Sequence, residues 1–527
     1  MHHPGRLFYG VQFCGTGICA LLFPEILTSG IPRRSLPYHP AMHDMAGRLA
    51  FCGKKGYAIE ERTIRRVSVL RKSSTNLTTG NITKQILLFA IPIFVGQLFQ
   101  TLYNSVDAIV VGNAVGTTAL AAVSASADIS HLLVGFFTGL STGAGVLFAR
   151  SFGAGDHKKL HNAIHTTITF SLILGTLIAA LGIICSPLLL RIVDCPADVY
   201  EEALLYLRVY LIGVLFTALY NVGAGVLRAV GDSRNPLYFL VISSVTNIVL
   251  DVLLVVVLPL GVIGAALATV ISQFVSVFLV VRKMLRTTDV YRLILRDLHI
   301  DRKLLFEVLD LGIPAAIQAS LISISNLFVT RYINSFGSAA MAGIGAAKKI
   351  DRFAGMVAQS LGLATSTFVG QNVGAKRFDR AFQGIRICLL SAFLYVAVVG
   401  TLIYYNAETL TRVFTNDQEA ISFGVAMITT MIPLYFFQAC NQIFANAVRG
   451  FGKSRVVMFC SIGGMIVCRQ IFLAITMHID WNVRNIYYGY PLGWACAAIA
   501  VFVYYLFAIR RHYPEEARIR LPFRKNA

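Results

Sequence analysis

Four polar side chains recur along one otherwise apolar stretch, between residues 97 and 107. Gln97, Gln100, Asn104 and Asp107 are separated by three or four residues, a spacing that places all four on one face of a helix. Lipid would not solvate such a stripe, so we expect it to face the protein interior or a wet cavity.

A second acidic residue, Asp251, ends another apolar stretch and follows Asn247 by one helical turn. An amide and a carboxylate therefore stack on the same helix face. The next apolar stretch carries a Gly-x-x-x-Ala-x-x-x-Ser ridge (264–272), whose small residues let helices approach closely. Thr269 lies beside this ridge and can present its hydroxyl inward.

A charged side chain at the centre of a bilayer costs about 2.5–3.5 kcal/mol on insertion scales, so both acids need a physical reason. In a shared cavity, burial and mutual repulsion favour the protonated carboxyl group and permit reversible protonation. Alternatively, the oxygens of Asp107, Asn247, Asp251 and Thr269 enclose a sodium ion. A third alternative is structural: hydrogen-bonded helix-end acids, an interhelical amide and a threonine bonded to its own helix.

Composition indicates that these residues lie in a membrane protein. Apolar residues make up 56% of the chain and charged residues 14%, with a mean hydropathy of +0.68. The net charge of +20 comes from short clusters of Lys and Arg between apolar segments, and no basic stripe with interleaved aromatics predicts nucleic acid as a partner. The ten cysteines are scattered without a CxxC motif, which argues against a metal site or a disulfide framework.

The chain predicts an all-α polytopic fold with twelve transmembrane helices. The expected spans are 86–111, 125–149, 162–186, 203–226, 236–258, 262–282, 305–333, 350–371, 384–405, 420–446, 456–478 and 489–509. Basic residues are concentrated in alternate connections, so the positive-inside rule predicts that both termini are cytoplasmic. We expect the protein to lie in the plasma membrane.

An internal repeat divides the spans into two sets of six. Four matches keep a nearly constant register: Pro92 with Pro314 and Asn104 with Asn326 at an offset of 222, then Gly153 with Gly374 and Arg228 with Arg449 at 221. Because each half has an even number of spans, the halves share one orientation. We therefore expect two six-helix lobes related by a pseudo-two-fold axis along the membrane normal, with a cavity between them.

We expect four regions along the chain. Residues 1–80 form an N-terminal extension, expected to be disordered and cytoplasmic, in which Met45 is an alternative start. Residues 81–300 form the N-lobe with helices 1–6, residues 301–512 form the C-lobe with helices 7–12, and residues 513–527 form a cytoplasmic tail.

The C-lobe lacks the acids of the N-lobe, since Val329 and Phe472 stand where the repeat would place them. The sequence instead places Lys349–Arg352 at the start of the eighth span as an interfacial ion-pair set, and predicts that Gln371 and Asn372 cap its end. The residues predicted to line the cavity are Gln97, Gln100, Asn104, Asn326, Tyr435 and Gln438; aromatic core packing is the alternative for Tyr435.

Taken together, the motifs resemble the multidrug and toxic compound extrusion (MATE) family over about residues 81–512. The matching motifs are Leu-Tyr-Asn-x-x-Asp (102–107), Gly-x-x-x-Gly (112–116), Arg-Ala-x-Gly-Asp-Ser-Arg-Asn-Pro (228–236), Asn-Ile-Val-Leu-Asp (247–251), Gly-Val-x-Gly-Ala-Ala-x-Ala-Thr (261–269) and Thr-Phe-Val-Gly-Gln-Asn-x-Gly-Ala (367–375). The resemblance implies a monomeric antiporter in the membrane lipid that exports organic cations or amphipathic drugs in exchange for protons or sodium ions, without a cofactor.

Within that family the chain looks most similar to the DinF-like branch, where N-lobe residues carry the coupling. The resemblance assigns this role to Asp107, Asn247, Asp251 and Thr269. The NorM-like branch has a Glu after the proline of the seventh helix, whereas Pro314 is followed by no acid here. A flippase for a lipid-linked precursor is the alternative function, and it predicts a more cationic cavity than this sequence indicates. The chain carries no His-Glu-x-x-His motif or other catalytic constellation of an enzyme.

Overall fold

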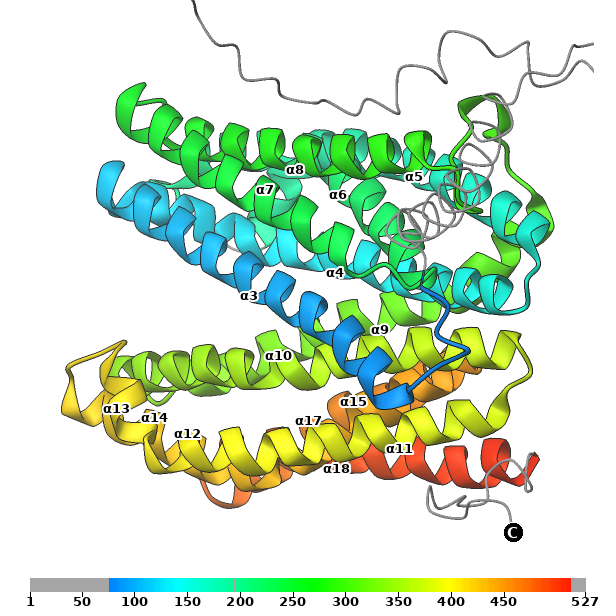
Figure 1. Ribbon diagram of the computed structural model, residues 1–527. Helices are drawn as coiled ribbons and strands as arrows, with labels where there is room; N and C mark the ends of the chain where they lie inside the picture. Colours follow the sequence, from blue (N-terminus) through cyan, green and yellow to red (C-terminus); the bar gives the residue numbers. More distant parts are fainter. Residues whose placement is uncertain (1–74, 193–194, 513–527) are drawn as a thin grey trace, which may run out of the picture. The chain divides into compact units, whose positions relative to one another are not determined.

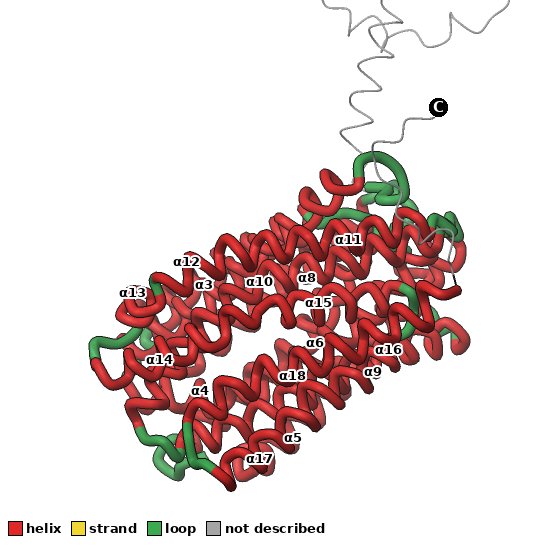
Figure 2. Tube along the Cα trace, turned by 90° about the horizontal axis from the view of Figure 1, so that it is seen from below, coloured by secondary structure: helices red, strands yellow, loops and turns green. Residues whose placement is uncertain are grey.

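The computed structural model describes residues 75–192 and 195–512, except for some side chains between residues 104 and 131. The N-terminal extension before residue 75 and the tail after residue 512 lie outside the described residues. Within the described part, the chain forms helices joined by short loops, and no strand occurs there (Figure 2).

The N-lobe contributes six long helical stretches. They are α3 (Ile82–Ala114), α4 (Thr117–Gly153), α5 (His157–Ile192), α6 (Tyr200–Ala229), α7 (Arg234–Asp251) continued by the π-helix η1 (Val252–Val257), and α8 (Gly261–Arg286). A connection containing the short 3-10 helix η2 (Leu295–Asp297) leads to the C-lobe.

The C-lobe contributes six more stretches, several with a break in their regular hydrogen bonding. They are α9 (Arg302–Asn334), α10 (Ser338–Gly374), α11 (Phe378–Tyr395) with η3 (Val396–Gly400) and α12 (Thr401–Tyr405), α14 (Gln418–Met431) with η4 (Ile432–Leu434) and α15 (Tyr435–Gly450), α16 (Ser454–Ser461) with η5 (Ile462–Cys468) and α17 (Arg469–Ile479), and α18 (Val483–Tyr504) with η6 (Tyr505–Ile509) and η7 (Arg510–His512). The short α13 (Ala407–Arg412) lies between α12 and α14.

Eleven of these stretches are long and apolar enough to cross a membrane. The twelfth, α10, has 37 residues but carries Lys348, Lys349, Asp351 and Arg352 in its first half. The prediction that these charges open the span is wrong. The helix begins at Ser338, and small residues form its first turns before the charges. The twelve-helix, two-lobe fold itself is confirmed.

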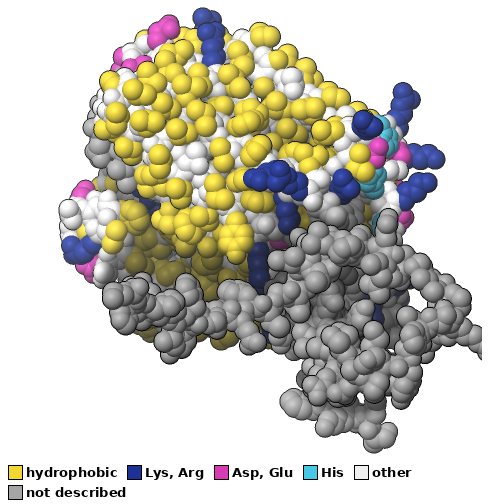
Figure 3. Space-filling view, turned by 45° about the horizontal axis from the view of Figure 1, so that its top comes forward, with side chains coloured by type: hydrophobic (Ala, Val, Ile, Leu, Met, Phe, Trp, Pro, Cys, Tyr) yellow, Lys and Arg dark blue, Asp and Glu magenta, His cyan; other side chains and the backbone are white. Residues whose placement is uncertain are grey.

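The outer surface has the polarity that lipid requires. On α5, large apolar side chains at Ile173, Leu177, Leu181, Ile184 and Leu188 are exposed at helical spacing, while small residues occupy the opposite, buried face. Figure 3 shows apolar side chains over most of the visible described surface, with charged side chains around its edges and in one group near the middle. Water would have to solvate this apolar surface at high cost, whereas lipid does not.

The two lobes meet through helices that correspond to each other in the repeat. In the N-lobe α5, α4 and α8 pack on α6, and α7 packs on α3 and α8; in the C-lobe α10 packs on α11, α14 and α15. Between the lobes, α4 packs against α9 and α10, and α3 crosses to α10 and α11 (Figure 1). In the repeat, α3 corresponds to α9 and α4 corresponds to α10. The α4–α9 and α10–α3 contacts are therefore related by the pseudo-two-fold axis.

Glycines allow the α4–α9 contact to be unusually close. A Cβ atom on Gly139 would lie 2.6 Å from the backbone of Ala316, and one on Gly143 would lie 2.3 Å from the Cα of Gly312. The Gly-x-x-x-Gly spacing therefore presents a flat backbone surface on α4 to α9. Any side chain at these two positions would force the helices apart.

The ends of α4 and α10 contact each other reciprocally. A Cβ atom on Gly153 would lie 1.9 Å from the carbonyl oxygen of Gln371, and one on Gly374 would lie 2.1 Å from that of Arg150. Gly153 and Gly374 are repeat partners, and so are Arg150 and Gln371. The contact therefore lies where the pseudo-two-fold axis passes between the lobes, and it holds their loop ends together.

Gln371 ties this contact to further segments. Its side chain accepts a hydrogen bond from the backbone N–H of Leu77 at 2.9 Å and donates one to the carbonyl of Ala229 at 2.7 Å. The sequence predicted a helix cap here, but Gln371 connects α10 to the end of α6. Leu77 is buried and belongs to the segment expected to be disordered, so the ordered chain begins before the boundary predicted at residue 80.

We predict that Gly374→Val separates the ends of α4 and α10. The added side chain cannot fit against the Arg150 backbone, and overpacking of this kind costs about 1–3 kcal/mol. Spin labels at positions 157 and 376 of a cysteine-free protein would report a longer mean distance, with a lower melting temperature in detergent.

Gly345→Val is the matched control, because a Cβ atom on this glycine of the same helix meets nothing within 4 Å. It should leave both readouts unchanged. An unchanged label distance in the Gly374 variant would contradict the role assigned to the contact.

Candidate ion-coupling site

The structure brings the two N-lobe acids into one region. Asp107 lies in the second half of α3, and Asp251 is the last residue of α7, which packs on α3. Their carboxyl groups are close enough to interact electrostatically, and the Tyr206 hydroxyl on α6 lies near both. Three helices thus surround a pair of like charges.

These polar groups are buried without hydrogen-bond partners. Asn247 is 1% exposed and Asp251 is fully buried. Within the described part of the chain, both side-chain polar atoms of Asn247, both carboxylate oxygens of Asp251 and Oδ1 of Asp107 lack a partner. Burying an unpaired polar atom costs about 1–3 kcal/mol and burying a charge costs more, so this arrangement favours a site that binds an ion over hydrogen-bonded acids without a function.

The backbone around Asp251 departs from a regular helix. The π-helix η1 begins at the next residue, and π-turns inside α-helices occur frequently at functional sites. A Cβ atom on Gly264 of α8 would lie 2.9 Å from the carbonyl oxygen of Leu254 in η1. The small-residue ridge on α8 therefore fits directly against the irregular turn.

The position of Thr269 follows from the contact between α7 and α8. Ser243 of α7 donates a hydrogen bond to the carbonyl oxygen of Ser272 on α8 at 2.6 Å. The two helices are consecutive and run in opposite directions, so one turn further along α7 lies opposite one turn back along α8. This places Asn247 opposite the turn of Thr269, whose side chain is largely buried.

The polar stripe on α3 is divided between the lobes. Near the middle of α3, Gln97 accepts a hydrogen bond from the Ser360 hydroxyl of α10 at 3.3 Å. Gln100 is exposed, and the side chain of Asn104 lies outside the described residues. The stripe therefore contacts the C-lobe at Gln97, whereas Asp107 at its other end lies close to Asp251 in the N-lobe.

Of the predicted C-lobe residues, Asn326 contacts a buried cation that the sequence pattern did not single out, whereas Tyr435 and Gln438 contact α10. Arg469, alone in an apolar stretch of the eleventh span, donates to the side-chain oxygen of Asn326 at 3.0 Å. Tyr435 donates a hydrogen bond to Asp351, and Gln438 lies against Gly355 of α10. A single Arg between Ile-Val-Cys and Gln-Ile-Phe was the signal that could have revealed this interior cation.

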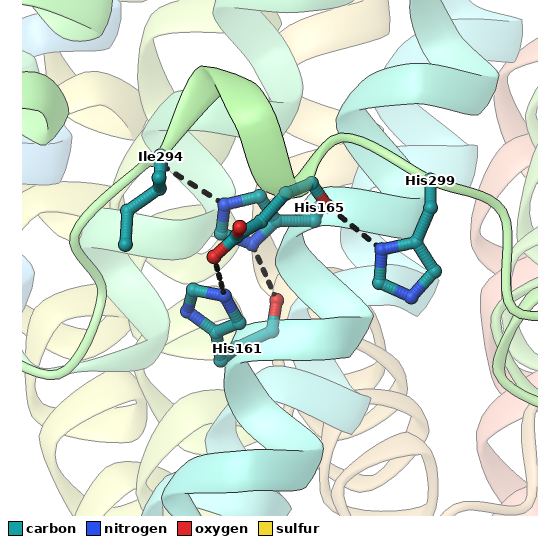
Figure 4. A network of polar contacts seen from close by, with 5 residues as sticks. His161, His165, Ile294 and His299 are labelled. Carbon is teal, nitrogen blue, oxygen red and sulfur yellow. Dashed lines mark hydrogen bonds and ion pairs between the residues drawn. The ribbon is translucent and has the colours of Figure 1, made fainter.

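One cluster in the described residues has a composition that could hold a metal ion: His161, His165 and Asp297. The imidazole of His165 is fully buried and already bonded at both nitrogens, since Nδ1 donates to the His161 carbonyl at 2.7 Å and Nε2 accepts from the Ile294 N–H at 3.0 Å (Figure 4). His161 contacts Asp297 at 3.1 Å. The cluster is therefore better explained as a structural tie between α5 and the connection between the lobes.

Duplicated six-helix lobes, an apolar belt and unpartnered acids in one lobe define a membrane transporter. The chain belongs to the MatE family, whose model matches residues 92–253 and 314–475. The two matched segments are equally long and begin 222 residues apart, at Pro92 and Pro314. This confirms the predicted duplication and its register.

Proteins similar to this chain share nearly its whole helical part. It is 30% identical over 443 residues to "Probable multidrug resistance protein YoeA" of Bacillus subtilis (strain 168), covering 82% of this chain and 95% of that protein. It is 28% identical to "Probable multidrug resistance protein YpnP" of the same strain, covering 82% and 96%. A solved MATE family transporter of the MOP superfamily, in an outward-facing conformation, superposes with a TM-score of 0.78 at 26% identity, covering 84% of this chain and 98% of that one.

We predict that His165→Ala lowers stability much more than His161→Ala. Removing His165 creates a cavity and leaves the Ile294 N–H unpaired, a loss of about 3 kcal/mol, whereas the partly exposed His161–Asp297 pair contributes about 1 kcal/mol or less. Thermal melting of both variants in detergent measures the difference. Equal losses, together with a rise in melting temperature of the unmodified protein on adding Zn²⁺, would instead identify a metal site.

Proposed function

We propose that this protein exports cationic or amphipathic organic compounds across the cell membrane in exchange for protons or sodium ions. The observation that carries the proposal is the group of Asp107, Asn247 and Asp251: in the described part of the chain, Oδ1 of Asp107 and all side-chain polar atoms of Asn247 and Asp251 are buried without a partner. Similarity to proteins named for multidrug resistance supports the substrate class. The flippase alternative is not favoured by these similarities.

The coupling follows from competition at the N-lobe acids. A bound proton or sodium ion neutralises part of the charge that Asp107 and Asp251 concentrate in a low-dielectric environment. Asn247 and Thr269 supply neutral oxygens beside them. A cationic substrate in the adjacent space disfavours the bound ion by repulsion, and the ion disfavours the substrate in the same way. Binding of one therefore promotes release of the other.

Alternating access requires that the lobes separate at one end and then at the other. The contact of Gly153 and Gly374 supports closure at the end where α4 and α10 finish. Lys158 and Lys159 lie in the first turn of α5, just after the end of α4, and the positive-inside rule assigns that end to the cytoplasm. With the cytoplasmic end closed, the ion site would communicate with the outside, and the similarity to a relative solved in an outward-facing conformation supports this.

The sequence motifs and the loop charges support further properties of the transporter. The N-lobe of residues 81–300 carries the coupling, as in the DinF-like branch, and the C-lobe of residues 301–512 moves against it. Both termini are cytoplasmic, the transporter acts as a monomer, and its partners are small organic molecules and lipid.

Neutralising either acid should uncouple export from the ion gradient. In proteoliposomes, we expect Asp107→Asn and Asp251→Asn to lower the initial rate of gradient-driven export of a fluorescent cation by about tenfold or more, within the range for loss of a coupling free energy of about 1–3 kcal/mol. Parallel vesicles with an imposed pH gradient or an imposed sodium gradient identify the coupling ion.

Glu307→Gln serves as the matched control. Glu307 forms a partly exposed ion pair with Lys159 at the loop end of α9, at 2.7 Å, and lies outside the site. It should transport at nearly the normal rate. Ion-driven export that is undiminished in both aspartate variants would refute the coupling role.

A further inference from the structure

A buried cation occupies the C-lobe in a span whose N-lobe counterpart carries an acid. Arg469 begins α17, directly after the π-helix η5, within the apolar eleventh span, and is only 3% exposed. Asp251, in the fifth span, also adjoins a π-helix. The two halves therefore place opposite charges beside irregular turns of equivalent spans.

Neutral groups hold the Arg469 side chain in place. The guanidinium donates to the Ser325 hydroxyl at 2.6 Å and to Asn326 Oδ1 at 3.0 Å, both on α9. Its Nε–H is buried and lacks a partner in the described part of the chain. Among the described residues no carboxylate forms an ion pair with Arg469. The side chain is thus oriented without being neutralised.

A second cation strengthens the positive charge at this point. Lys348 of α10 is close enough to interact electrostatically with Arg469 and with Asp351. Asp351 is the acid near this cluster, and it accepts a hydrogen bond from Tyr435. Arg352 also interacts with Asp351, so the cations in this partly buried group outnumber the acid, and a further anion would stabilise them.

We propose that Arg469 and Lys348 form a binding site for the anionic group, a carboxylate or a phosphate, of an amphipathic aromatic compound. The guanidinium provides donors in a planar fork suited to such groups, and Lys348 adds a point charge. The partly exposed ring of Tyr490 lies 5.2 Å from the Arg469 guanidinium. Aromatic surface therefore adjoins the cationic groups.

The site is not sealed by its neighbours. Lys348, Asp351 and Tyr490 are only partly buried, and Asn326, which holds the guanidinium, is exposed. A ligand can therefore approach Arg469 from the side of α9 and α10. Resting on the proposed export function, this inference narrows the substrates to compounds that carry an anionic group in addition to a cationic or apolar part.

Two dyes that differ only in one carboxylate test the site. Rhodamine B has a free carboxylate, and its ethyl ester does not. We expect the purified protein in maltoside micelles to bind rhodamine B at least about tenfold more tightly than the ester, by fluorescence anisotropy. In Arg469→Gln and Lys348→Gln this preference should fall to nearly one, with little change in affinity for the ester.

Lys349→Gln is the control, because the Lys349 ammonium lies over the Phe414 ring at 5.1 Å. It should keep the preference for rhodamine B. Competition by dihexanoylphosphatidylglycerol but not by dihexanoylphosphatidylcholine would extend the site to anionic lipid headgroups, and competition by neither would restrict it to soluble carboxylates and phosphates.

Equal affinity for the two dyes in the unmodified protein, or a preference retained in both site variants, would overturn the inference. Because binding is measured without an ion gradient, this result is independent of coupling. Failure of the proposed export function would appear in the aspartate variants in vesicles and not in this binding preference.

Discussion

The backbone contact between α4 and α10 is the constraint on which the rest of the structure depends. Gly153 lies against Gln371 and Gly374 lies against Arg150, so two pairs of repeat partners meet across the pseudo-two-fold axis. Because no side chain separates the helices, the backbones of the two lobes are in direct contact at this end. Gln371 then adds hydrogen bonds to Leu77 and Ala229. A contact built from backbone and a few hydrogen bonds can hold two lobes together and still be released as a unit.

Duplication gave both lobes the same scaffold, and their buried charges then distinguish them. The N-lobe buries Asp107 and Asp251, whereas the C-lobe buries Arg469 beside Lys348. In lipid every such charge needs a neutralising partner, and in neither lobe does the described part supply enough of them. We infer that the missing partners are the transported species, with a cation in the N-lobe and an anionic group in the C-lobe.

The sequence predicted the fold well because membrane helices are determined by local composition. Apolar length located the spans, and the repeat at Pro92 and Pro314 established the two halves. The prediction of helix boundaries failed at α10. There the charged residues Lys348–Arg352 lower the apolar character of a helix that begins at Ser338. Packing among other helices, which a local pattern does not contain, stabilises that segment.

The candidate site was predictable only in part. Asp107, Asn247 and Asp251 stood out because each is polar in an apolar helix, and their spacing gave their faces. That they lie together depends on how α3, α6 and α7 pack. Gln371 looked like a cap because its partners are about 142 and 294 residues away in the chain. The sequence pattern did not single out Arg469, because a lone cation has no second polar residue at helical spacing to indicate its role.

The most direct test of the account is the exchange of ion for substrate at equilibrium. Rhodamine B, which carries a cationic group and a carboxylate, would be added to purified protein in weakly buffered detergent solution, while a pH indicator follows proton release and bound ²²Na⁺ is counted in parallel. We expect protons or sodium ions to leave the protein as the dye binds. Binding of the dye with release of neither ion would contradict it.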